Sequence, residues 1–554
     1  MGFDRVSSEY LIEMRDNLLN KHWQRIVIGA AIASIITPSW ALPTANSIGS
    51  AGIDALRLHT SPYNLTGKKI AIGQVEVGRP GQFGWDKTAQ QNKYKLEQIF
   101  YQDGAAKANK NVEQHATMVA SVMISRDKRF PGVAPDARLY ATAVGIPKDT
   151  GQPEECLSTQ HVATQNGGDV RAINLSFGEP LSRDPRPQAK LDGNALFTQC
   201  LDWSARVHNV TYIVAGNQGK GGISIPTDNY NGINVAYSNL RQGIYRKLDF
   251  ANLSEMPTGT AKSIEDREVN VGNRRSIGLV APGGNLQLYN LAGKPIVVNG
   301  TSFAAPHVTG TVALLQEFGD RQFRTKSQMP IDLRPRWNLD SRRHEVMKAV
   351  LLNSADKIQD AGNGLRLGMT RTILAKNNRD WTESESYQNR QIPLDYQLGA
   401  GQLNAFRAYQ QFSPGQYPPL LPAPAIGWDY RTVDSGGYRD YPIDRPLAEN
   451  SWVSIALTWD RLVELQDPNG NGQYDLGEQF RDRGLNRLDL YLMRAEENRL
   501  DRSLWSSTSS VDSVQHIFHQ IRDPGKYKIR VHFRQAVNLP RQAYGLAWWT
   551  VPSK

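Results

Sequence analysis

The chain has 554 residues, of which 40% are hydrophobic, 21% charged and 9% aromatic. This composition supplies enough apolar material for a sizeable core and excludes a wholly disordered or collagen-like chain. Only two cysteines are present, which excludes a disulfide-rich scaffold and a four-thiolate zinc site. Lysine and arginine outnumber aspartate and glutamate by 64 to 54. These basic residues form no long run, so nucleic acid is not an expected partner.

One short apolar segment, residues 26–36, lies near the N-terminus between basic residues and the small residues Ser39 and Ala41. It is too short for a membrane span, which needs about 20 residues. The pattern predicts a secretory signal peptide over residues 1–41, cleaved after Ala41, with an uncleaved anchor or a short buried helix as the alternative. We therefore expect no membrane span after signal cleavage, and a protein that is secreted, periplasmic or held at the cell surface.

Export bears on the two cysteines, Cys156 and Cys200. An oxidising compartment would allow them to form a disulfide. Two separate buried thiols are the alternative, because the sequence does not show whether the two positions lie close together.

Short β-branched segments alternate with helical patterns from about Gly67 onward. Strands separated by helices predict an α/β fold in which a parallel sheet lies between layers of helices. In such sheets functional residues gather in loops at the carboxyl ends of the strands. The predicted strands are 69–77, 139–144, 170–175, 211–215 and 233–236, and the predicted helices are 115–125, 195–207, 304–316, 342–352 and 405–411.

The pattern changes after residue 412. Residues 413–424 are proline-rich without periodicity, which is typical of a linker. Alternating apolar and polar residues between turn signals then predict a small antiparallel β-sandwich. Its predicted strands include 452–459, 487–493, 514–518 and 526–533. We expect an α/β domain at 50–412, a linker at 413–424 and a β-sandwich domain at 425–554.

The segment Asn299–Gly310 (NGTSFAAPHVTG) places Ser302 between a glycine turn and an apolar helix start. A hydroxyl there would lie near free backbone N–H groups that favour developing negative charge. Pro306 is expected in the first helical turn, where its missing N–H costs little. Taken alone, Ser302 fits a simple helix N-cap equally well.

Three further segments carry polar residues at strand or helix ends. His115 begins a helical pattern in EQHATMVA, and Asn217 follows the apolar strand of IVAGNQG. Ser176–Gly178 ends another strand, whose edge would pair with an extended peptide. Two of them have a common structural explanation: a structural or solvated histidine, and an asparagine that makes a turn.

Together these segments resemble the subtilisin-like serine peptidases, the S8 family. The string from Gly300 to Gly310 is nearly complete for that family, the other segments follow in the family order, and the resemblance covers roughly residues 50–412. It implies that Ser302 is the nucleophile, that His115 is its general base, and that Asn217 and the Ser302 N–H hold the oxyanion. It also implies a polypeptide substrate, bound along Ser176, Phe177, Gly178, Ala215 and Gly216.

The chain departs from the family at the third triad member, where the usual aspartate is missing from GQVEVG. Aligning Gly78 with the glycine of the family motif puts Glu76 at the acid position. A carboxylate there would fix the imidazole tautomer and stabilise the imidazolium. Asp86 and Asp103 also precede His115, but in polar loop-like contexts that rank below Glu76. The alternative is that Glu76 has no function and the enzyme is slow or inactive.

The segment 467–478 (DPNGNGQYDLGE) matches a twelve-residue calcium loop at every specified position. Gly472 would permit the sharp turn, and the strand-like flanks indicate a structural ion rather than a sensor. The alternative is an acidic, glycine-rich hairpin. The expected calcium ligands are Asp467, Asn469, Asn471, Gln473 through its carbonyl, Asp475 and Glu478.

The surrounding strands resemble the bacterial pre-peptidase C-terminal domain, on short motifs at 488–492 and 523–531. The whole chain is therefore expected to be an exported serine endopeptidase. Two alternatives stay open: a catalytically weak or dead pseudopeptidase that binds peptides, and a cell-surface adhesin whose β-domain does the binding.

Overall fold

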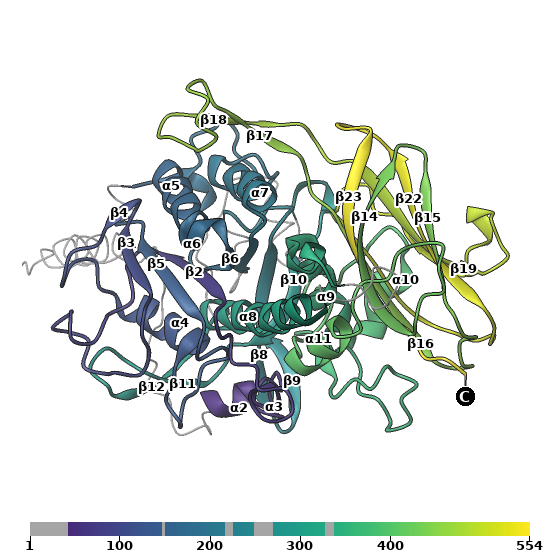
Figure 1. Ribbon diagram of the computed structural model, residues 1–554, viewed down its shortest axis with the longest axis horizontal. Coiled ribbons are helices and arrows are strands. Elements are labelled where there is room, and N and C mark those ends of the chain that lie inside the picture. The colour runs from purple at the N-terminus through teal and green to yellow at the C-terminus, as the bar shows by residue number, and fades with distance from the viewer. Residues whose placement is uncertain (1–41, 147–149, 217–224, 249–269, 327–336, 554) are drawn as a thin grey trace, which may run out of the picture.

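The computed structural model describes residues 42–146, 150–216, 225–248, 270–326 and 337–553. The predicted signal peptide, residues 1–41, and Asn217 lie outside these ranges. Figure 1 shows an α/β part, coloured purple to green, beside a β-rich part coloured green to yellow. Within the described ranges, no helix has the length and apolar character needed to cross a membrane.

The α/β part is built on one large sheet whose central strands are parallel, as the sequence predicts. The strand order is β13-β9-β8-β7-β6-β2-β5-β3-β4, and β10 also pairs with β8. The strands are β2 (Ala71–Glu76), β3 (Gln98–Tyr101), β4 (Gly104–Ala105), β5 (Arg138–Ala143), β6 (Val170–Leu175), β7 (Thr211–Ala215), β8 (Ile233–Arg241), β9 (Ile244–Leu248), β10 (Ile277–Pro282) and β13 (Ile373–Leu374).

Helices cover both faces of this sheet, because successive strand residues point to opposite sides. Ile72 belongs to the core under α4 and α8, and its neighbour Ala71 to the core under α5 and α7. A small sheet of β1 (Leu42–Pro43), β11 (Leu286–Tyr289) and β12 (Pro295–Val298) lies apart. The helices are α2 (Thr44–Ile48), α3 (Leu56–His59), α4 (Gln114–Ile124), α5 (Gln152–Ala163), α6 (Gln165–Gly168), α7 (Leu196–His208), α8 (Thr301–Lys326), α9 (His344–Ser354), α10 (Glu385–Gln388) and α11 (Ala405–Phe412).

The β-rich part is a sandwich of two antiparallel four-stranded sheets, which agrees with the predicted fold class. Alternate residues such as Leu488, Leu490 and Leu492 fill the core between the sheets. One sheet contains β14 (Ile426–Asp434), β23 (Arg541–Trp549), β16 (Trp452–Thr458) and β21 (Val514–Gln520). The other contains β15 (Tyr438–Pro442), β22 (Tyr527–Gln535), β19 (Arg487–Arg494) and β20 (Trp505–Ser507).

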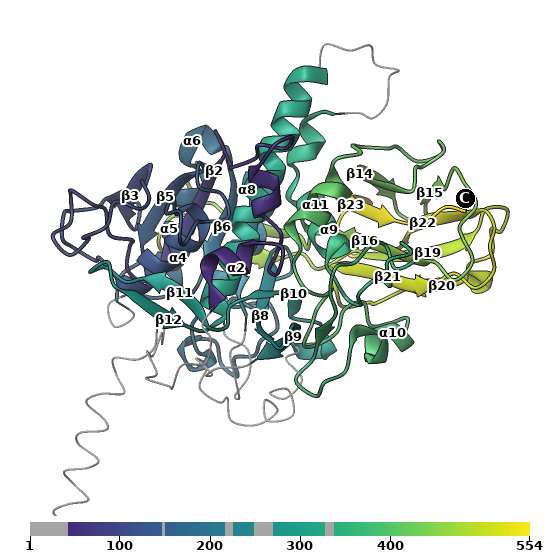
Figure 2. The ribbon, with the colours of Figure 1, turned by 90° about the horizontal axis from the view of Figure 1, so that it is seen from below.

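The two parts share an apolar core at their junction, where α9 packs against β16 and β23 (Figures 1 and 2). A Cβ at Gly545 would lie 2.5 Å from the backbone of Glu345, so only glycine permits this close approach of β23 to α9. The proline-rich segment 413–424 is held at Gln416, bridged to Trp428, and at Ala423, bridged to Ile443. The sandwich is therefore packed onto the α/β part.

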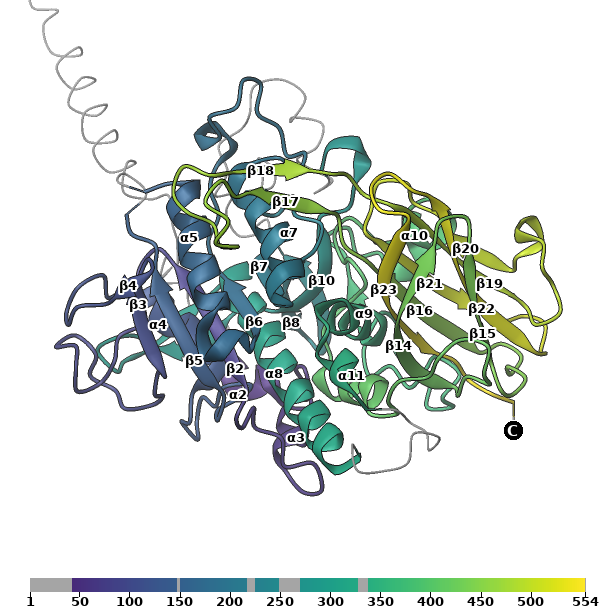
Figure 3. The same ribbon diagram turned by 45° about the horizontal axis from the view of Figure 1, so that its top comes forward.

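A separate hairpin leaves the sandwich and lies on the α/β part (Figure 3). It consists of β17 (Val463–Gln466) and β18 (Gln479–Asp482), and both strands contact α7. Tyr474 and Phe480 join the core formed by α5 and α7. The segment 467–478 thus has strands at both ends, as the sequence predicts.

Candidate active site

Glu76 and His115 meet at the carboxyl end of the central strand β2. Glu76 ends β2 and is fully buried, and His115 lies in the first turn of α4 with 3% of its surface exposed. Glu76 Oε2 is 3.4 Å from His115 Nδ1. Burial alone would lower the pKa of His115, but the charge and the close polar contact of Glu76, and after them the charge of Glu113, outweigh it, and the pKa is raised. The imidazole therefore lies against the carboxylate that the sequence selects.

Ser302 is the second residue of α8, and its hydroxyl lies at the helix N-terminus. Its Oγ donates a long hydrogen bond of 3.3 Å to the carbonyl of Ser176, the first residue of the expected substrate-binding edge. The next residue, Phe303, packs its ring on His115 with 5.5 Å between ring centroids. The packing of Phe303 thus brings the start of α8 and the start of α4 together.

Pro306 corrects one expectation, because it lies in the second turn of α8 rather than the first. A proline there has no N–H for the carbonyl four residues earlier, which is that of Ser302. Ser176 fills this gap, since its Oγ donates to the Ser302 carbonyl at 2.9 Å. Asn174 in turn donates to Ser176 Oγ at 2.8 Å. The proline therefore leaves free the Ser302 carbonyl, which accepts from Ser176 and so ties the end of β6 to the residue expected to be the nucleophile.

The two expected substrate-binding segments lie on either side of the α8 start. The carbonyl of Gly216, which follows Ala215 at the end of β7, accepts a hydrogen bond of 3.0 Å from Thr301 Oγ1. Phe177 does not face outward, because its ring is buried and stacks on Phe197. Ser176, Phe177 and Gly178 would therefore meet a peptide through their backbone.

The other two candidate acids do not meet His115: Asp86 is paired with Arg79, and Asp103 is exposed. Asp86 accepts two hydrogen bonds of 2.7 Å from the guanidinium of Arg79, and both side chains are fully buried. Burial raises the pKa of Asp86, but the hydrogen bonds from Arg79 and from backbone amides lower it overall. Asp103 is exposed in the turn between β3 and β4. Glu76 therefore remains the carboxylate that meets His115 from the sheet.

The sequence comparisons agree with this geometry. A family model described as the subtilase family, Peptidase S8, matches residues 17–370, which is more than half of the chain. The chain belongs to the subtilase family.

Individual relatives of this subtilase are distant. Subtilisin DY of Bacillus licheniformis is 28% identical over 203 residues, which cover 36% of this chain and 62% of that protein. Subtilisin Savinase of Lederbergia lenta is 29% identical over 206 residues, which cover 37% and 63%. The matched region thus spans a little under two thirds of the length of these relatives.

Solved structures give fainter likenesses to this subtilase. A cold adapted subtilisin-like serine proteinase is 15% identical with a TM-score of 0.35, covering 56% of this chain and 89% of the other. The prenylagaramide maturation protease PagA is 18% identical with a TM-score of 0.37, covering 62% and 92%. Likenesses this distant add nothing to the family assignment.

The loop at 467–478 brings its polar side chains together. The Asn469 and Asn471 amides donate to Asp475 Oδ2 at 2.7 and 2.8 Å. Asp467 accepts backbone N–H groups from the glycine turn, including that of Gly472, whose φ is +73°. Within the described part of the subtilase, the buried Oε1 of Glu478 has no hydrogen-bond partner. Oxygen donors of this kind are the ligands that calcium prefers, but in the described structure the three acidic side chains of the loop do not bring their oxygens within 4.8 Å of one another.

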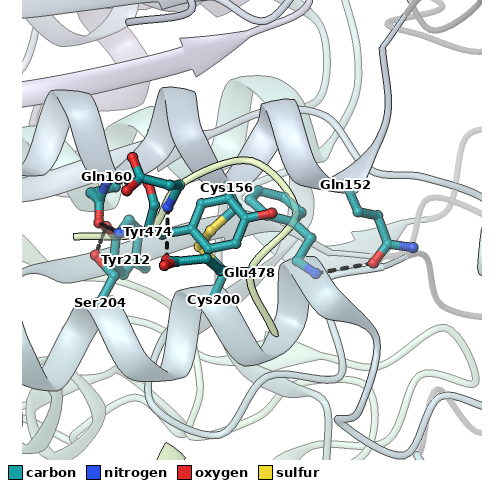
Figure 4. Close-up of a disulfide and its surroundings, with 10 residues drawn as sticks. Gln152, Cys156, Gln160, Cys200, Ser204, Tyr212, Tyr474 and Glu478 are labelled. Atoms are coloured by element: carbon teal, nitrogen blue, oxygen red, sulfur yellow. Dashed lines mark hydrogen bonds between the residues drawn. A yellow bond between two sulfur atoms is a disulfide. The ribbon is translucent and has the colours of Figure 1, made fainter. Parts of the chain in front are cut away.

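This loop is joined to helix α5 beside a disulfide (Figure 4). Gln160 of α5 donates to the Tyr474 carbonyl at 3.0 Å and accepts from the Tyr474 N–H at 2.5 Å. Beneath them Cys156 of α5 and Cys200 of α7 are bonded, with 5.8 Å between their Cα atoms. The two cysteines therefore form a disulfide rather than two separate buried thiols, which the sequence alone did not decide.

Sequence reasoning missed one carboxylate at the active site of this subtilase. Glu113 lies directly before α4, and ligand atoms of Glu76, Glu113 and His115 all lie within 4.8 Å of one another. The only signal was its place two residues before His115.

Proposed function

We propose that this chain is a serine endopeptidase that hydrolyses peptide bonds of extended polypeptide segments through an acyl-enzyme. The observation that carries the proposal is the Glu76–His115 contact beside Ser302 at the start of α8. A serine hydroxyl is a poor nucleophile near pH 7 and needs a neighbouring base, which His115 supplies. His115 takes the Ser302 proton during attack on the carbonyl carbon and returns it to the leaving amine.

The rest of the mechanism divides among three groups. Glu76 holds the imidazole and stabilises its protonated form. The Ser302 N–H and Asn217 donate to the oxyanion of the tetrahedral intermediate. The backbones of Ser176–Gly178 and of Ala215 and Gly216 hold the peptide on each side of Ser302, a role supported by the contacts of both segments with the α8 start.

A fluorophosphonate probe, which reacts with activated serines, tests this proposal on the full chain. The wild type and a Ser413→Ala control should label and should hydrolyse an unfolded protein substrate, because Ser413 lies at the end of α11 away from the site. Ser302→Ala should do neither. Absence of labelling and hydrolysis in the folded wild type would refute the proposal.

A peptide-binding pseudopeptidase is the second candidate. Its supporting observation is that the Glu76–His115 contact of 3.4 Å is long, and both Glu76 oxygens lack a hydrogen-bond partner among the described residues. Catalytic contacts are often loose before substrate binds, which favours the enzyme. A folded wild type that binds a peptide without cutting it over days would favour the pseudopeptidase.

We propose that a calcium ion occupies the loop at 467–478 and fixes the hairpin on α5 and α7. The ligands would be Asp467, Asn469, Asn471, the Gln473 carbonyl, Asp475 and Glu478. Since an ion that binds only the folded state stabilises it, calcium at 100 times its Kd should add about 2.7 kcal/mol. The melting temperature of the full chain should rise with calcium and fall with chelator. Glu478→Gln should abolish the difference, and an unchanged wild-type melting temperature in millimolar calcium would contradict the proposal.

For the whole chain we propose a signal peptide at 1–41, a peptidase domain at 50–412, a linker at 413–424 and a β-sandwich domain at 425–554. Resemblance of the last to the pre-peptidase C-terminal domain supports a role in secretion, stability or substrate docking. Export to the periplasm, cell surface or medium follows from the signal peptide. N-terminal sequencing of the exported protein should begin at Leu42, and a retained Met1 would contradict cleavage.

A further inference from the structure

Glu113 stands at the N-cap of α4 with an extended backbone, φ −134° and ψ 139°. Its backbone is fixed on both sides. Its N–H donates to the Arg79 carbonyl at 2.9 Å, and its carbonyl accepts the Thr117 N–H at 3.1 Å. Thr117 Oγ1 donates to the same carbonyl at 2.9 Å. The direction in which the Glu113 side chain leaves the backbone is therefore set by the segment after β2 and by α4 together.

The approach of this residue to β2 depends on Gly78. A Cβ at Gly78 would lie 2.4 Å from Glu113 Cβ and 3.0 Å from the Asn111 carbonyl oxygen. Any larger residue would push the segment before α4 away from the end of β2. The glycine two residues after Glu76 thus allows a second acidic side chain to reach the strand end.

The Glu113 carboxyl is not used as a helix cap. Its side chain makes no capping hydrogen bond of good geometry, although the N–H groups of His115 and Ala116 lie close enough to lower its pKa, and its buried Oε2 has no hydrogen-bond partner within the described ranges. Instead the side chain lies beside Glu76 and His115. One carboxylate oxygen of each glutamate and one ring nitrogen of His115 all lie within 4.8 Å of one another. Two carboxylates thus meet a single imidazole.

The charged groups around His115 are few. Glu76 faces it from β2 and Glu113 from the start of its own helix, and their charges are the ones that act on it. From α8 the contact is the uncharged ring of Phe303. The nearby Arg79 and Asp86 neutralise each other. The two carboxylates therefore favour the protonated ring over the neutral one, because its positive charge offsets part of theirs.

Given the proposed peptidase activity, we infer that Glu113 is a positioning residue of the catalytic centre, which shares with Glu76 the stabilisation of the protonated His115 ring. The long Glu76–His115 contact gives this second acid a role, because a single carboxylate at 3.4 Å holds an imidazolium less firmly than one at hydrogen-bond distance. Consistent with this, burial raises the pKa of Glu113, His115 lowers it and Glu76 raises it further.

The test compares Glu113→Gln with Glu113→Asp and with a control, Glu97→Gln, at an exposed glutamate. The readout is the pH profile of kcat/KM on a peptide substrate. Loss of a charge this close lowers a histidine pKa by about one unit, so the acid limb should move to lower pH by about one unit in Glu113→Gln. Glu113→Asp should restore part of the shift, and Glu97→Gln should match the wild type.

A second measurement separates this inference from the peptidase proposal. The His115 ring is titrated by NMR in Ser302→Ala, with and without Glu113→Gln. An unmoved His115 titration in a folded variant overturns the inference whether or not the wild type cuts peptides. A shifted titration in a chain without turnover refutes only the peptidase proposal. The third outcome is that Glu113→Gln lowers kcat/KM as much as Glu76→Gln does, with no shift of the acid limb of the pH profile. This result would make Glu113 the triad acid and overturn its positioning role.

Discussion

Two buried histidines in this subtilase each lie between two carboxylates. His115 has Glu76 and Glu113, and His344, the first residue of α9, has Asp460 and Glu345. For both, burial lowers the pKa and the carboxylates raise it more strongly, so the net pKa is raised. Exposure is 3% for His115 and 2% for His344, so neither charge nor burial distinguishes them.

The hydrogen bonds of the two rings differ. His344 Nε2 lies 3.0 Å from both Asp460 oxygens, and its Nδ1 lies 3.1 Å from Asn209 Oδ1. This ring links α9 to the segment after β16, and both of its nitrogens already have hydrogen-bond partners. Among the described residues His115 Nδ1 has no hydrogen-bond partner of good geometry, and its ring neighbours the Ser302 segment. The two histidines are therefore distinguished by their neighbours: both ring nitrogens of His344 are engaged within the fold, whereas the His115 ring packs beside the segment that carries Ser302.

The largest expected effect is on the catalytic cluster. Glu76→Gln keeps the shape of the side chain but removes the charge that stabilises the imidazolium. We expect kcat to fall by about 10³–10⁴-fold, the scale seen when the acid of a serine triad is neutralised, with little change in stability. Steady-state hydrolysis of a peptide measures it, with Asp103→Asn as the control. A loss below tenfold would show that Glu76 is not the triad acid.

The next effect concerns the structural cluster. Asp460→Asn removes one partner of a buried pair and should lower the free energy of unfolding by about 3–5 kcal/mol. A histidine whose pKa is raised by folding contributes stability below pH 6.5 that is lost as pH rises through the raised value. The penalty in urea unfolding should therefore be larger at pH 6 than at pH 9.

The control for this change is Asp501→Asn, at an exposed ion pair with Arg499, which should leave the unfolding midpoint unchanged. Activity per folded Asp460→Asn molecule should match the wild type. A variant that is fully stable but inactive would reverse the assignment of the His115 cluster to catalysis and of the His344 cluster to stability.

The smallest expected effect concerns Glu345, which lies beside His344 as Glu113 lies beside His115. Burial and the charge of Asp460 raise the pKa of Glu345, although His344 lowers it. A carboxyl group whose pKa is raised by folding makes the folded protein less stable as pH rises above the pKa of that group in the unfolded chain. The variant Glu345→Gln should therefore be as stable as the wild type near pH 4.5. At pH 8 it should be slightly more stable, by up to about 1 kcal/mol. Urea unfolding at both pH values checks this, and a clear loss at pH 8 would contradict it.

Much of the site is readable from the chain because its residues occur in short motifs with fixed local structure. Ser302 follows a glycine turn, and Glu76 ends an apolar strand. Glu113 was missed because a position before a helix does not tell whether the side chain caps the helix or turns to another strand. The place of Pro306 was missed for a similar reason. The Ser176 hydroxyl, which donates to the carbonyl that Pro306 leaves without a partner, lies 126 residues away in the chain.

By itself the sequence determined the layers of the fold, the parallel sheet and the sandwich, and it supplied the candidates for nucleophile, base and acid, because periodicity and motifs are local. Only the tertiary structure decided which distant groups meet. Cys156 pairs with Cys200, Tyr474 joins Gln160, and a second acid reaches His115. The physical reason is that these meetings depend on how closely elements approach, and a single glycine such as Gly78 sets that distance.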